Sequence, residues 1–237
     1  IFPHHENEIA QSEAANGVPF AHYWMHNGFL NINNQKMSKS LGNFFTVREI
    51  GEKYDLQVLR FFMLSAHYRT PLNFSAELMD AAKSGLERVL TAADNLKHLS
   101  GAAKTEHMTD EEKAAFSASE DFVKKFEAAM EDDANTADAV SAVFELVKFA
   151  NSNTSSENSK EYLDALYDRL NTLCGVLGIR VERKEEILDT EIEGLIAERQ
   201  AARKEKNFAR ADEIRDLLLE KGIVLEDTRE GVKWKRA

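Results

Sequence analysis

Residues 75–99 read SAELMDAAKSGLERVLTAADNLKHL, with apolar side chains recurring every three or four positions. This spacing places the apolar side chains on one face of an α-helix, and such a face is normally buried against other helices. Ser75 directly precedes the run, where its hydroxyl can cap the first turn. The segment therefore predicts one long amphipathic helix inside a helical bundle.

Helical patterns continue on both sides of this segment. Only 3 prolines and 11 glycines interrupt the 237 residues, so long helices should dominate the fold. Thr46 with Glu49, and Thr109 before an acidic first turn, are typical starting signals. Other helices are expected at residues 3–15, 55–64, 135 onward, 162–173, 191–207 and 210–221.

Shorter segments are expected to be strands and loops. Residues 20–32 contain aromatic and β-branched side chains broken by Asn27-Gly28, which predicts a short hairpin. Residues 33–43 are polar and predict a loop, as do residues 67–73 around Pro71. Residues 223–228 and 232–235 flank a turn containing Gly231 and predict a second hairpin.

These elements predict a mainly α protein with three domains. Residues 1–50 form a small mixed piece and residues 51–180 a helical bundle. Residues 181–237 form a small α+β domain made of a helical pair and a hairpin. The chain opens with Ile1 inside a dense polar cluster, so we expect it to be the C-terminal part of something longer.

Composition excludes several classes of protein. No run of about 18 apolar residues is present, which argues against a transmembrane helix and a membrane partner. The net charge of −11 argues against indiscriminate DNA binding, although an RNA ligand needs only a local basic face. The single cysteine, Cys174, excludes an intrachain disulfide and favours a reducing, cytoplasmic compartment. We expect Cys174 to be a buried, inert thiol.

His4 and Glu8 are the first candidate site. They are four residues apart on a predicted helix, so the imidazole and the carboxylate can converge on one cation. Zinc accepts both ligand types but prefers four ligands, so the pair is half a site. Spacing alone favours the alternative, a helix N-terminus carrying ordinary polar side chains, and it leaves His5 and Glu6 open as neighbours.

Residues 36–40, Lys-Met-Ser-Lys-Ser, are the second candidate site. Two lysines three positions apart on a serine-containing loop can bring two ammonium groups to a polyphosphate, while hydroxyls and loop amides add donors. Such cations stabilise negative charge that develops during phosphate transfer. The alternative is a generic basic loop with no ligand.

The last 39 residues, from Arg199 onward, are locally basic: 11 Lys and Arg against 8 Asp and Glu give +3 within a chain of −11. This asymmetry favours the end of the chain as an RNA-contacting region. Trp234, between two lysines, can stack on a base or pack on the helical pair, and the two remain equally open. Arg203 and Arg210 can contact phosphate, although solvation on the helix surface is the commoner fate of such residues.

The run Lys36-Met37-Ser38-Lys39-Ser40 resembles the KMSKS motif of class I aminoacyl-tRNA synthetases. Phe-Pro-His-His-Glu-Asn-Glu, residues 2–8, precedes it by the interval typical of cysteinyl-tRNA synthetases, and the similarity continues over essentially the whole chain. Residues 65–75 and 132–136 carry it, with Ala134 in place of the family's usual Phe, and so does the segment from Ala211 to Trp234.

The resemblance implies roles for the two candidate sites and a place for them in the fold. It makes His4 and Glu8 two ligands of one zinc ion, and Lys39 the ATP-contacting lysine with Lys36 as its partner. It also implies the end of a class I Rossmann catalytic domain, followed by a helical bundle and an anticodon-binding domain. The family's HIGH motif and its two zinc-binding cysteines are missing from this sequence.

The activity that the resemblance implies is the ATP- and Mg-dependent attachment of L-cysteine to tRNA(Cys) through a cysteinyl-adenylate. We expect the full-length enzyme to have this activity and the present chain to be inactive alone. One alternative is a non-catalytic helical tRNA-binding or interaction module derived from a synthetase. A second is a ligase that transfers cysteine to a small-molecule amine, which the well-formed anticodon-binding tail disfavours.

Overall fold

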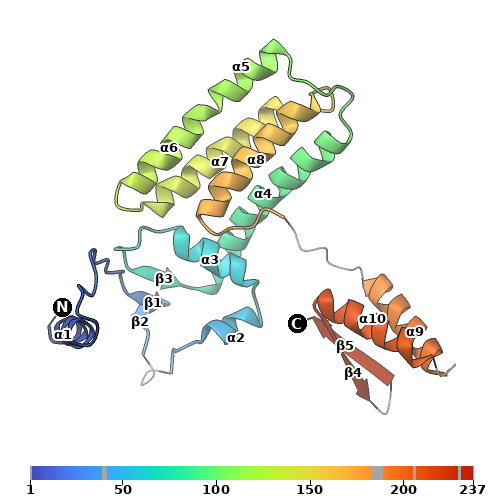
Figure 1. The fold of residues 1–237 in the computed structure, drawn as a ribbon, viewed down its shortest axis with the longest axis horizontal. Coiled ribbons are helices and arrows are strands. Elements are labelled where there is room, and N and C mark those ends of the chain that lie inside the picture. Colours follow the sequence, from blue (N-terminus) through green and yellow to red (C-terminus); the bar gives the residue numbers. More distant parts are fainter. Residues whose placement is uncertain (1, 39–41, 183–188, 205–206, 229–230, 237) are drawn as a thin grey trace. The chain divides into compact units, whose positions relative to one another are not determined.

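The computed structural model describes the whole chain except residues 1, 39–41, 183–188, 205–206, 229–230 and 237. It forms two compact units, Ile1–Val181 and Glu182–Ala237. The mainly α prediction is confirmed (Figure 1), whereas the division into three domains stays a prediction. None of the helices in the described ranges has the length and apolar composition that a bilayer crossing requires.

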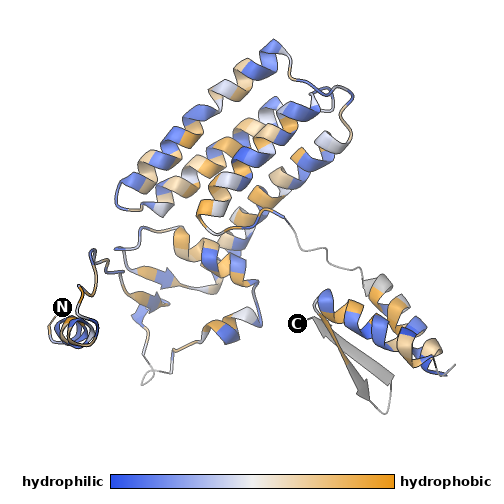
Figure 2. Ribbon diagram, viewed as in Figure 1, coloured by the Kyte–Doolittle hydropathy of each residue, from blue (hydrophilic) through white to orange (hydrophobic). Residues whose placement is uncertain are grey.

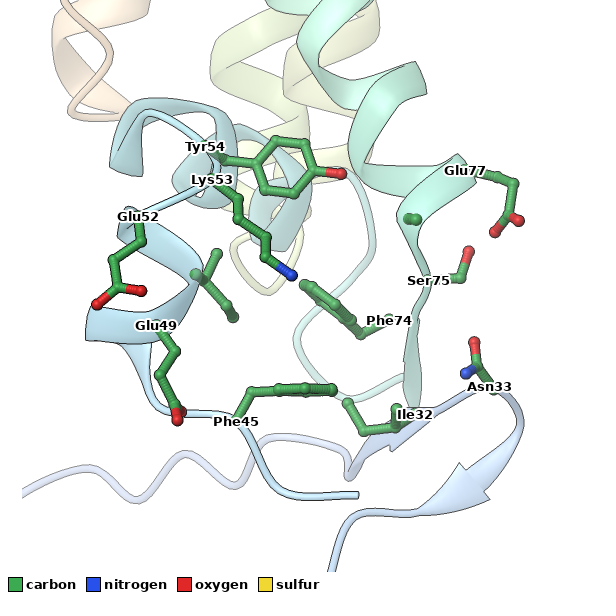
Figure 3. A pocket seen from close by; sticks show the side chains of 12 residues that line it. Ile32, Asn33, Phe45, Glu49, Glu52, Lys53, Tyr54, Phe74, Ser75 and Glu77 are labelled. Carbon is green, nitrogen blue, oxygen red and sulfur yellow. The ribbon is translucent and has the colours of Figure 1, made fainter. Parts of the chain in front are cut away.

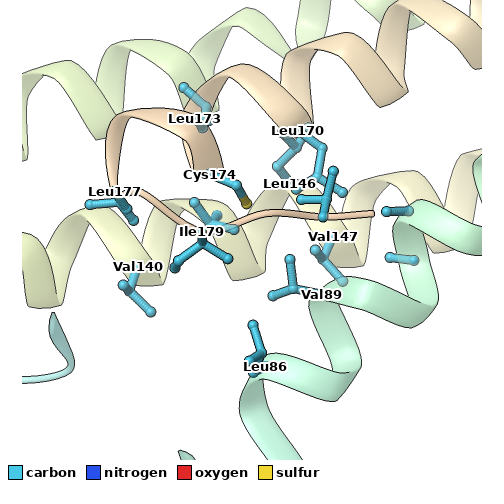
Figure 4. Close-up of a cluster of buried hydrophobic side chains, with 14 of the residues drawn as sticks. Leu86, Val89, Val140, Leu146, Val147, Leu170, Leu173, Cys174, Leu177 and Ile179 are labelled. Atoms are coloured by element: carbon cyan, nitrogen blue, oxygen red, sulfur yellow. The ribbon is translucent and has the colours of Figure 1, made fainter. Parts of the chain in front are cut away.

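A helical bundle makes up most of the first unit. Its helices are α4 (Ala76–Gly101), α5 (Asp110–Ala118), α6 (Glu120–Glu131), α7 (Thr136–Asn153) and α8 (Lys160–Val176). α4 packs on α7 and α8, and α6 packs on α7 (Figure 1). Figure 4 shows the centre of the core, where side chains from α4, α7 and α8 meet: Leu86, Val89, Leu146, Val147, Leu170 and Cys174.

The predicted helix at residues 75–99 is confirmed, because the cap and the buried apolar face both form as expected. The helix extends to Gly101. Ser75 accepts a hydrogen bond from the backbone N–H of Leu78, and the buried face includes Met79, Leu86 and Leu96. Burying such large side chains contributes roughly 1.5–3 kcal/mol each. α5, which the sequence also predicted, begins at a capping box between Thr109 and Glu112.

Three short strands lie beside the bundle: β1 (Leu30–Ile32), β2 (Gln35–Lys36) and β3 (Leu72–Phe74), in the order β2-β1-β3. β1 is antiparallel to β2 and parallel to β3. The helices of this region are α1 (His4–Asn16), α2 (Val47–Gly51) and α3 (Leu56–Leu64). α3 is almost wholly apolar (Figure 2) and packs on α4.

The hairpin predicted across residues 20–32 is wrong in position. The turn falls at Asn33 and Asn34, whose φ angles of 48° and 63° are those that a tight hairpin turn requires and that Asn tolerates. Gly28 instead donates its N–H to the carbonyl of Tyr68, and a Cβ on Gly28 would lie 2.6 Å from the Thr70 backbone. Residues 33–43 and 67–73 were both predicted to be loops. Each region instead contributes to a short strand, β2 and β3 respectively.

The second unit consists of two helices and a hairpin. The helices are α9 (Asp189–Lys204) and α10 (Phe208–Glu220), and the hairpin pairs β4 (Ile223–Thr228) with β5 (Gly231–Arg236). Gly222, at φ 76°, ends α10 as a C-cap glycine does. The small core is formed by Ile192, Ile196, Ile214, Leu218 and Ile223.

Candidate functional site

His4 and Glu8 lie one turn apart on α1, as predicted. The distance from His4 Nε2 to Glu8 Oε1 is 3.5 Å, and both side chains are exposed. Glu8 also faces His5, whose Nδ1 lies 3.7 Å from Glu8 Oε2. His5 Nδ1 is buried, and among the described residues it has no hydrogen-bond partner. The Glu8 carboxylate thus lies near two imidazoles without a hydrogen bond to His5.

His5 lies among other rings, which spacing along the helix did not reveal. Its ring centroid is 4.9 Å from that of His26 and 5.2 Å from that of Trp24. Burial lowers the pKa of His5, and the His26 imidazole acts in the same direction. The neutral imidazole, which is the form that binds metals, is therefore favoured.

The spacing of His4 and Glu8 fits two of the four ligands of a zinc ion. Nitrogen and oxygen atoms at zinc-bond lengths and a tetrahedral angle are about 3.4 Å apart, close to the observed separation. Among the described residues, no group of three or more His, Cys, Asp or Glu converges on one point. Two ligands are half of what zinc prefers, so the metal role of His4 and Glu8 stays a prediction.

The Lys36–Ser40 segment begins at the end of β2. Lys36 is exposed, and its Nζ lies 5.5 Å from the centre of the Phe29 ring. Met37 and Ser38 are half-buried, whereas Lys39 and Ser40 lie outside the described residues. The structure thus describes one of the two predicted lysines, on an exposed strand end.

Asn43 braces the start of this segment, and the sequence interpretation missed it. Its Oδ1 accepts the backbone N–H of Ser38 at 2.9 Å, and its Nδ2 donates to the carbonyl of Lys36 at 3.2 Å. Asn after Gly is a common loop residue because its side chain bonds nearby backbone. That preference alone did not identify which backbone groups Asn43 would hold.

A pocket of about 570 Å³ lies between β1, β3, α2 and the start of α4 (Figure 3). Its floor is apolar and includes Phe45 and Phe74, while Glu49, Glu52 and Glu77 outnumber Lys53 among its charged residues. A polyphosphate would be repelled by this excess of carboxylates. The pocket is therefore no substitute for the lysine segment as a nucleotide site.

Residues 65–75 and 132–136, which the sequence interpretation treated separately, meet in a polar cluster. Tyr68 donates its hydroxyl to Asp133 Oδ1 at 2.7 Å, and Arg69 Nε lies 2.9 Å from Asp133 Oδ2. Asp133 and Ala134 both have positive φ, 57° and 52°, which is strained for residues other than glycine. The hydrogen bond to Tyr68 and the charge of Asp133 raise the pKa of Arg69.

The predicted RNA-contacting residues of the second unit remain predictions. Trp234 pairs with Leu225 through the backbone of the hairpin, and its side chain lies outside the described part. Arg203 is exposed on α9. Arg210 is held by two carboxylates, 2.9 Å from Glu198 and 3.0 Å from Glu213. Any phosphate at Arg210 would compete with these ion pairs.

Cys174 is buried in the bundle, as predicted. Desolvation by burial raises the pKa of its thiol to about 12. A thiol in this state is a poor metal ligand and a poor nucleophile.

Three family models match separate parts of the chain. Residues 1–84 match the class I (C) tRNA synthetase catalytic domain, residues 125–182 the DALR domain, and residues 186–234 the cysteinyl-tRNA ligase anticodon binding domain. The first match contains both candidate sites, and the last contains Trp234.

Curated relatives match the chain from end to end. A cysteine–tRNA ligase from Lachnospira eligens is 70% identical over all 237 residues, which are 50% of that protein. Cysteine–tRNA ligases from Lachnoclostridium phytofermentans and Clostridioides difficile are 56% and 54% identical over 100% and 99% of the chain, or 52% and 50% of their own lengths. The chain therefore spans about half the length of these relatives.

A solved structure resembles part of the fold. The agnB2 LeuRS of Agrobacterium radiobacter K84, solved as a ternary complex with tRNA and LeuAMS, matches 66% of this chain and 20% of that one. The TM-score is 0.55 at 19% identity, which bears on the fold alone. With the three family models and the end-to-end matches to cysteine–tRNA ligases, the chain belongs to the cysteinyl-tRNA synthetase family.

Proposed function

We propose that this chain is part of a cysteine–tRNA ligase that uses ATP to attach L-cysteine to tRNA(Cys) through a cysteinyl-adenylate. The observation that carries the proposal is the end-to-end match, at 70% identity, to half of a cysteine–tRNA ligase. The working enzyme would also need the other half, because the present sequence contains no His-Ile-Gly-His motif. The protein would act in the cytoplasm.

Lys36 and Lys39 would neutralise the charge of the departing pyrophosphate. The cysteine carboxylate attacks the α-phosphorus of Mg-bound ATP, and negative charge then develops on the β- and γ-phosphates as the bond to the α-phosphorus breaks. Two ammonium groups stabilise that charge more in the transition state than in the ground state. Asn43, through its bonds to Ser38 and Lys36, would hold the start of the segment in place while the lysines bind. Met37, Ser38 and Ser40 would complete the ATP-binding segment.

His4 and Glu8 would supply two ligands for a zinc ion, and the remaining ligands would come from the other half of the enzyme. A zinc ion held there supplies a soft cation that prefers a thiolate to a hydroxyl, which distinguishes cysteine from serine. His4 Nε2 and Glu8 Oε1 lie 3.5 Å apart, one helical turn from each other, so both could reach the same ion.

The second unit would recognise the tRNA. Its basic balance from Arg199 onward supplies attraction to phosphates. Trp234 would stack on a base, and Arg203 and Arg210 would contact the backbone. Arg210 would have to exchange a carboxylate partner for a phosphate, which makes it the weakest of the three assignments.

The test uses the full-length ligase that contains this chain. Replacing Lys39 with Ala should slow cysteine-dependent ATP–pyrophosphate exchange by at least 100-fold while leaving tRNA affinity within twofold. Lys83→Ala, an exposed lysine on α4, is the matched control and should change neither. Equal loss of exchange and tRNA binding would contradict the role given to Lys39.

Trp234→Ala in the same enzyme separates the two units. It should weaken tRNA binding about tenfold, the loss expected for one stacked base, and leave pyrophosphate exchange unchanged. Normal tRNA affinity would overturn the stacking role. If the intact protein bound tRNA but catalysed no exchange, a non-catalytic tRNA-binding module would replace the proposed ligase.

A further inference from the structure

The turn that precedes Lys36 is held by a strand from another part of the chain. Asn33 and Asn34 connect β1 to β2, and β2 ends at Lys36. The Asn34 N–H donates to Asn73 Oδ1 at 2.6 Å, although Asn73 lies 39 residues further along the sequence. The Asn33 N–H donates to the carbonyl of Phe74 at 3.1 Å. Both acceptors belong to β3.

Strand β2 is short and exposed, so its own packing does little to fix its position. It consists of two residues, and neither is buried. Its register against β1 depends on the two-residue turn at Asn33 and Asn34, whose positive φ angles few residue types adopt. The hydrogen bond from Asn34 to Asn73 therefore bears directly on where Lys36 lies.

Strand β3 is itself firmly held, which a supporting element requires. Before the strand, Tyr68 donates its hydroxyl to Asp133 at 2.7 Å, and this bond ties the loop to the turn between α6 and α7. Along the strand, β3 pairs in parallel with β1. At its end, the Phe74 ring lies edge to face against Phe62 of α3, with the centroids 5.8 Å apart. A side chain on a strand fixed in this way can position a neighbouring segment precisely.

Asn73 and Asn43 hold Lys36 from opposite directions along the chain. Asn43 bonds to the backbone of Lys36 and Ser38, on the C-terminal side of β2. Asn73 acts from the N-terminal side, through the N–H of Asn34. A charged group that stabilises a transition state must be held close to its productive position, and the two amides together provide that restraint on the backbone of Lys36.

We propose that Asn73 is a positioning residue for Lys36: by accepting the Asn34 N–H, it sets the place of the Lys36 ammonium against the departing pyrophosphate. The inference rests on the proposed function, in which Lys36 acts on that charge. Asn73 acts through the turn and not by contact with the nucleotide. Loss of its acceptor therefore slows the chemical step and leaves ATP binding nearly unchanged, because Lys36 acts mainly on charge that develops in the transition state.

The first measurement is cysteine-dependent ATP–pyrophosphate exchange by the full-length ligase. Asn73→Leu removes the acceptor at similar side-chain size, so kcat should fall about tenfold while the KM for ATP stays within about threefold. Asn73→Asp keeps an acceptor oxygen and should stay within about threefold of the parent's kcat. Asn95→Leu makes the first change at an exposed position on α4 and should alter kcat less than about twofold. An unchanged kcat in Asn73→Leu, or an equal loss in Asn73→Asp, would overturn the proposal.

A double-mutant comparison separates positioning from folding. In a Lys36→Ala background, Asn73→Leu should slow the exchange reaction less than about twofold further, because the side chain that it positions is gone. The full tenfold loss in that background would mean that Asn73 supports the fold rather than Lys36, and the proposal would be wrong.

Hydrogen exchange tests the same inference without a catalytic step. In Asn73→Leu, the backbone amides of Asn34 and Ser38 should exchange at least fivefold faster, while the amide of Val89, in the buried face of α4, should not change. Acceleration at Asn34 alone would limit Asn73 to the turn and contradict the proposal, as would equal acceleration at Val89. A parent enzyme inactive in pyrophosphate exchange would overturn the proposed function, and these amides would still decide whether Asn73 positions the segment that begins at Lys36.

Discussion

The side-chain amide of Gln57 pairs with both backbone polar groups of Arg180, 123 residues away in the sequence. Arg180 N–H donates to Gln57 Oε1 at 2.9 Å, and Gln57 Nε2 donates to the Arg180 carbonyl at 3.0 Å. Residues 177–181 leave α8 with Leu177, Ile179 and Val181 buried in the core. Gln57, on α3, therefore holds in place the segment with which the first unit ends.

Replacing Gln57 with Met should release this segment. The variant keeps the side-chain length but removes both hydrogen bonds, so the free energy of unfolding should fall by about 1–2 kcal/mol. The backbone amide of Arg180 should exchange hydrogen at least tenfold faster. Gln57→Glu is the matched control, since it keeps the acceptor and should leave that amide protected. Unchanged exchange in Gln57→Met would show that packing alone holds the segment.

Glu112 predicts an acid-sensitive bundle. Its carboxylate is buried and accepts hydrogen bonds from Thr109 N–H, from Asn158, and from the N–H and hydroxyl of Ser159. Although desolvation by burial alone would raise the pKa of Glu112, these hydrogen bonds together outweigh it and lower the pKa to about 2, from an ordinary 4.5. Because the folded pKa is the lower one, the carboxylate contributes stability above about pH 4.5, and this contribution disappears as the pH falls toward 2.

The measurement compares Glu112→Gln with the parent chain by urea unfolding across pH. The variant should lose about 3 kcal/mol at pH 7, and the difference should shrink steadily below pH 4.5. Glu111→Gln changes an exposed neighbour and is the matched control. Its free energy of unfolding should stay within about 0.5 kcal/mol of the parent's at every pH, the usual size of a surface effect. A difference between Glu112→Gln and the parent that does not depend on pH would contradict the low pKa.

Two tyrosines should respond oppositely to the loss of a hydroxyl. Tyr162 is 1% exposed, and its hydroxyl has no hydrogen-bond partner among the described residues. The Tyr68 hydroxyl donates to Asp133 and accepts from Arg69. Tyr162→Phe should therefore keep or raise stability by up to about 1 kcal/mol, whereas Tyr68→Phe should lower it by about 0.5–1.5 kcal/mol. Thermal unfolding of the two variants gives the comparison, and destabilisation by Tyr162→Phe would reveal an unrecognised partner for its hydroxyl.

Sequence patterns correctly predicted the elements that are formed by interactions between residues close together in the sequence. The helix starts at Ser75, Thr109 and Thr46 depend on a side chain and a backbone amide a few residues apart, and each cap forms as expected. The hairpin of the second unit is likewise local, with Leu225 opposite Trp234. Periodicity and capping are properties of short windows, so a single sequence contains them.

Patterns failed where distant segments decide the outcome. Gly28 looked like a hairpin turn, but its role is to let the backbone approach Thr70, 42 residues on. The strand β3 exists because β1 lies beside it, and the partners of Asp133 and Gln57 lie 65 and 123 residues away. At the candidate sites, motif resemblance named His4, Glu8 and Lys36 as candidates, which stay predictions, but it did not reveal the hydrogen bonds of Asn43 or the rings around His5.

Cys174 should report the opening of the bundle. Its thiol is fully buried beside Leu146 and Leu170 (Figure 4). Burial raises the pKa of the thiol to about 12, so at pH 8 the thiolate fraction is on the order of one in ten thousand. Iodoacetamide should therefore modify the native chain only as fast as the bundle opens, and urea should accelerate the reaction in step with unfolding. Val176→Cys in a Cys174→Ala background places a thiol two residues away at a 61% exposed position and should react at once. Reaction of the native Cys174 as fast as this control would contradict the prediction. It would mean that residues 177–181 open while the bundle stays folded. The two hydrogen bonds of Gln57 would then hold that segment less firmly than their geometry indicates.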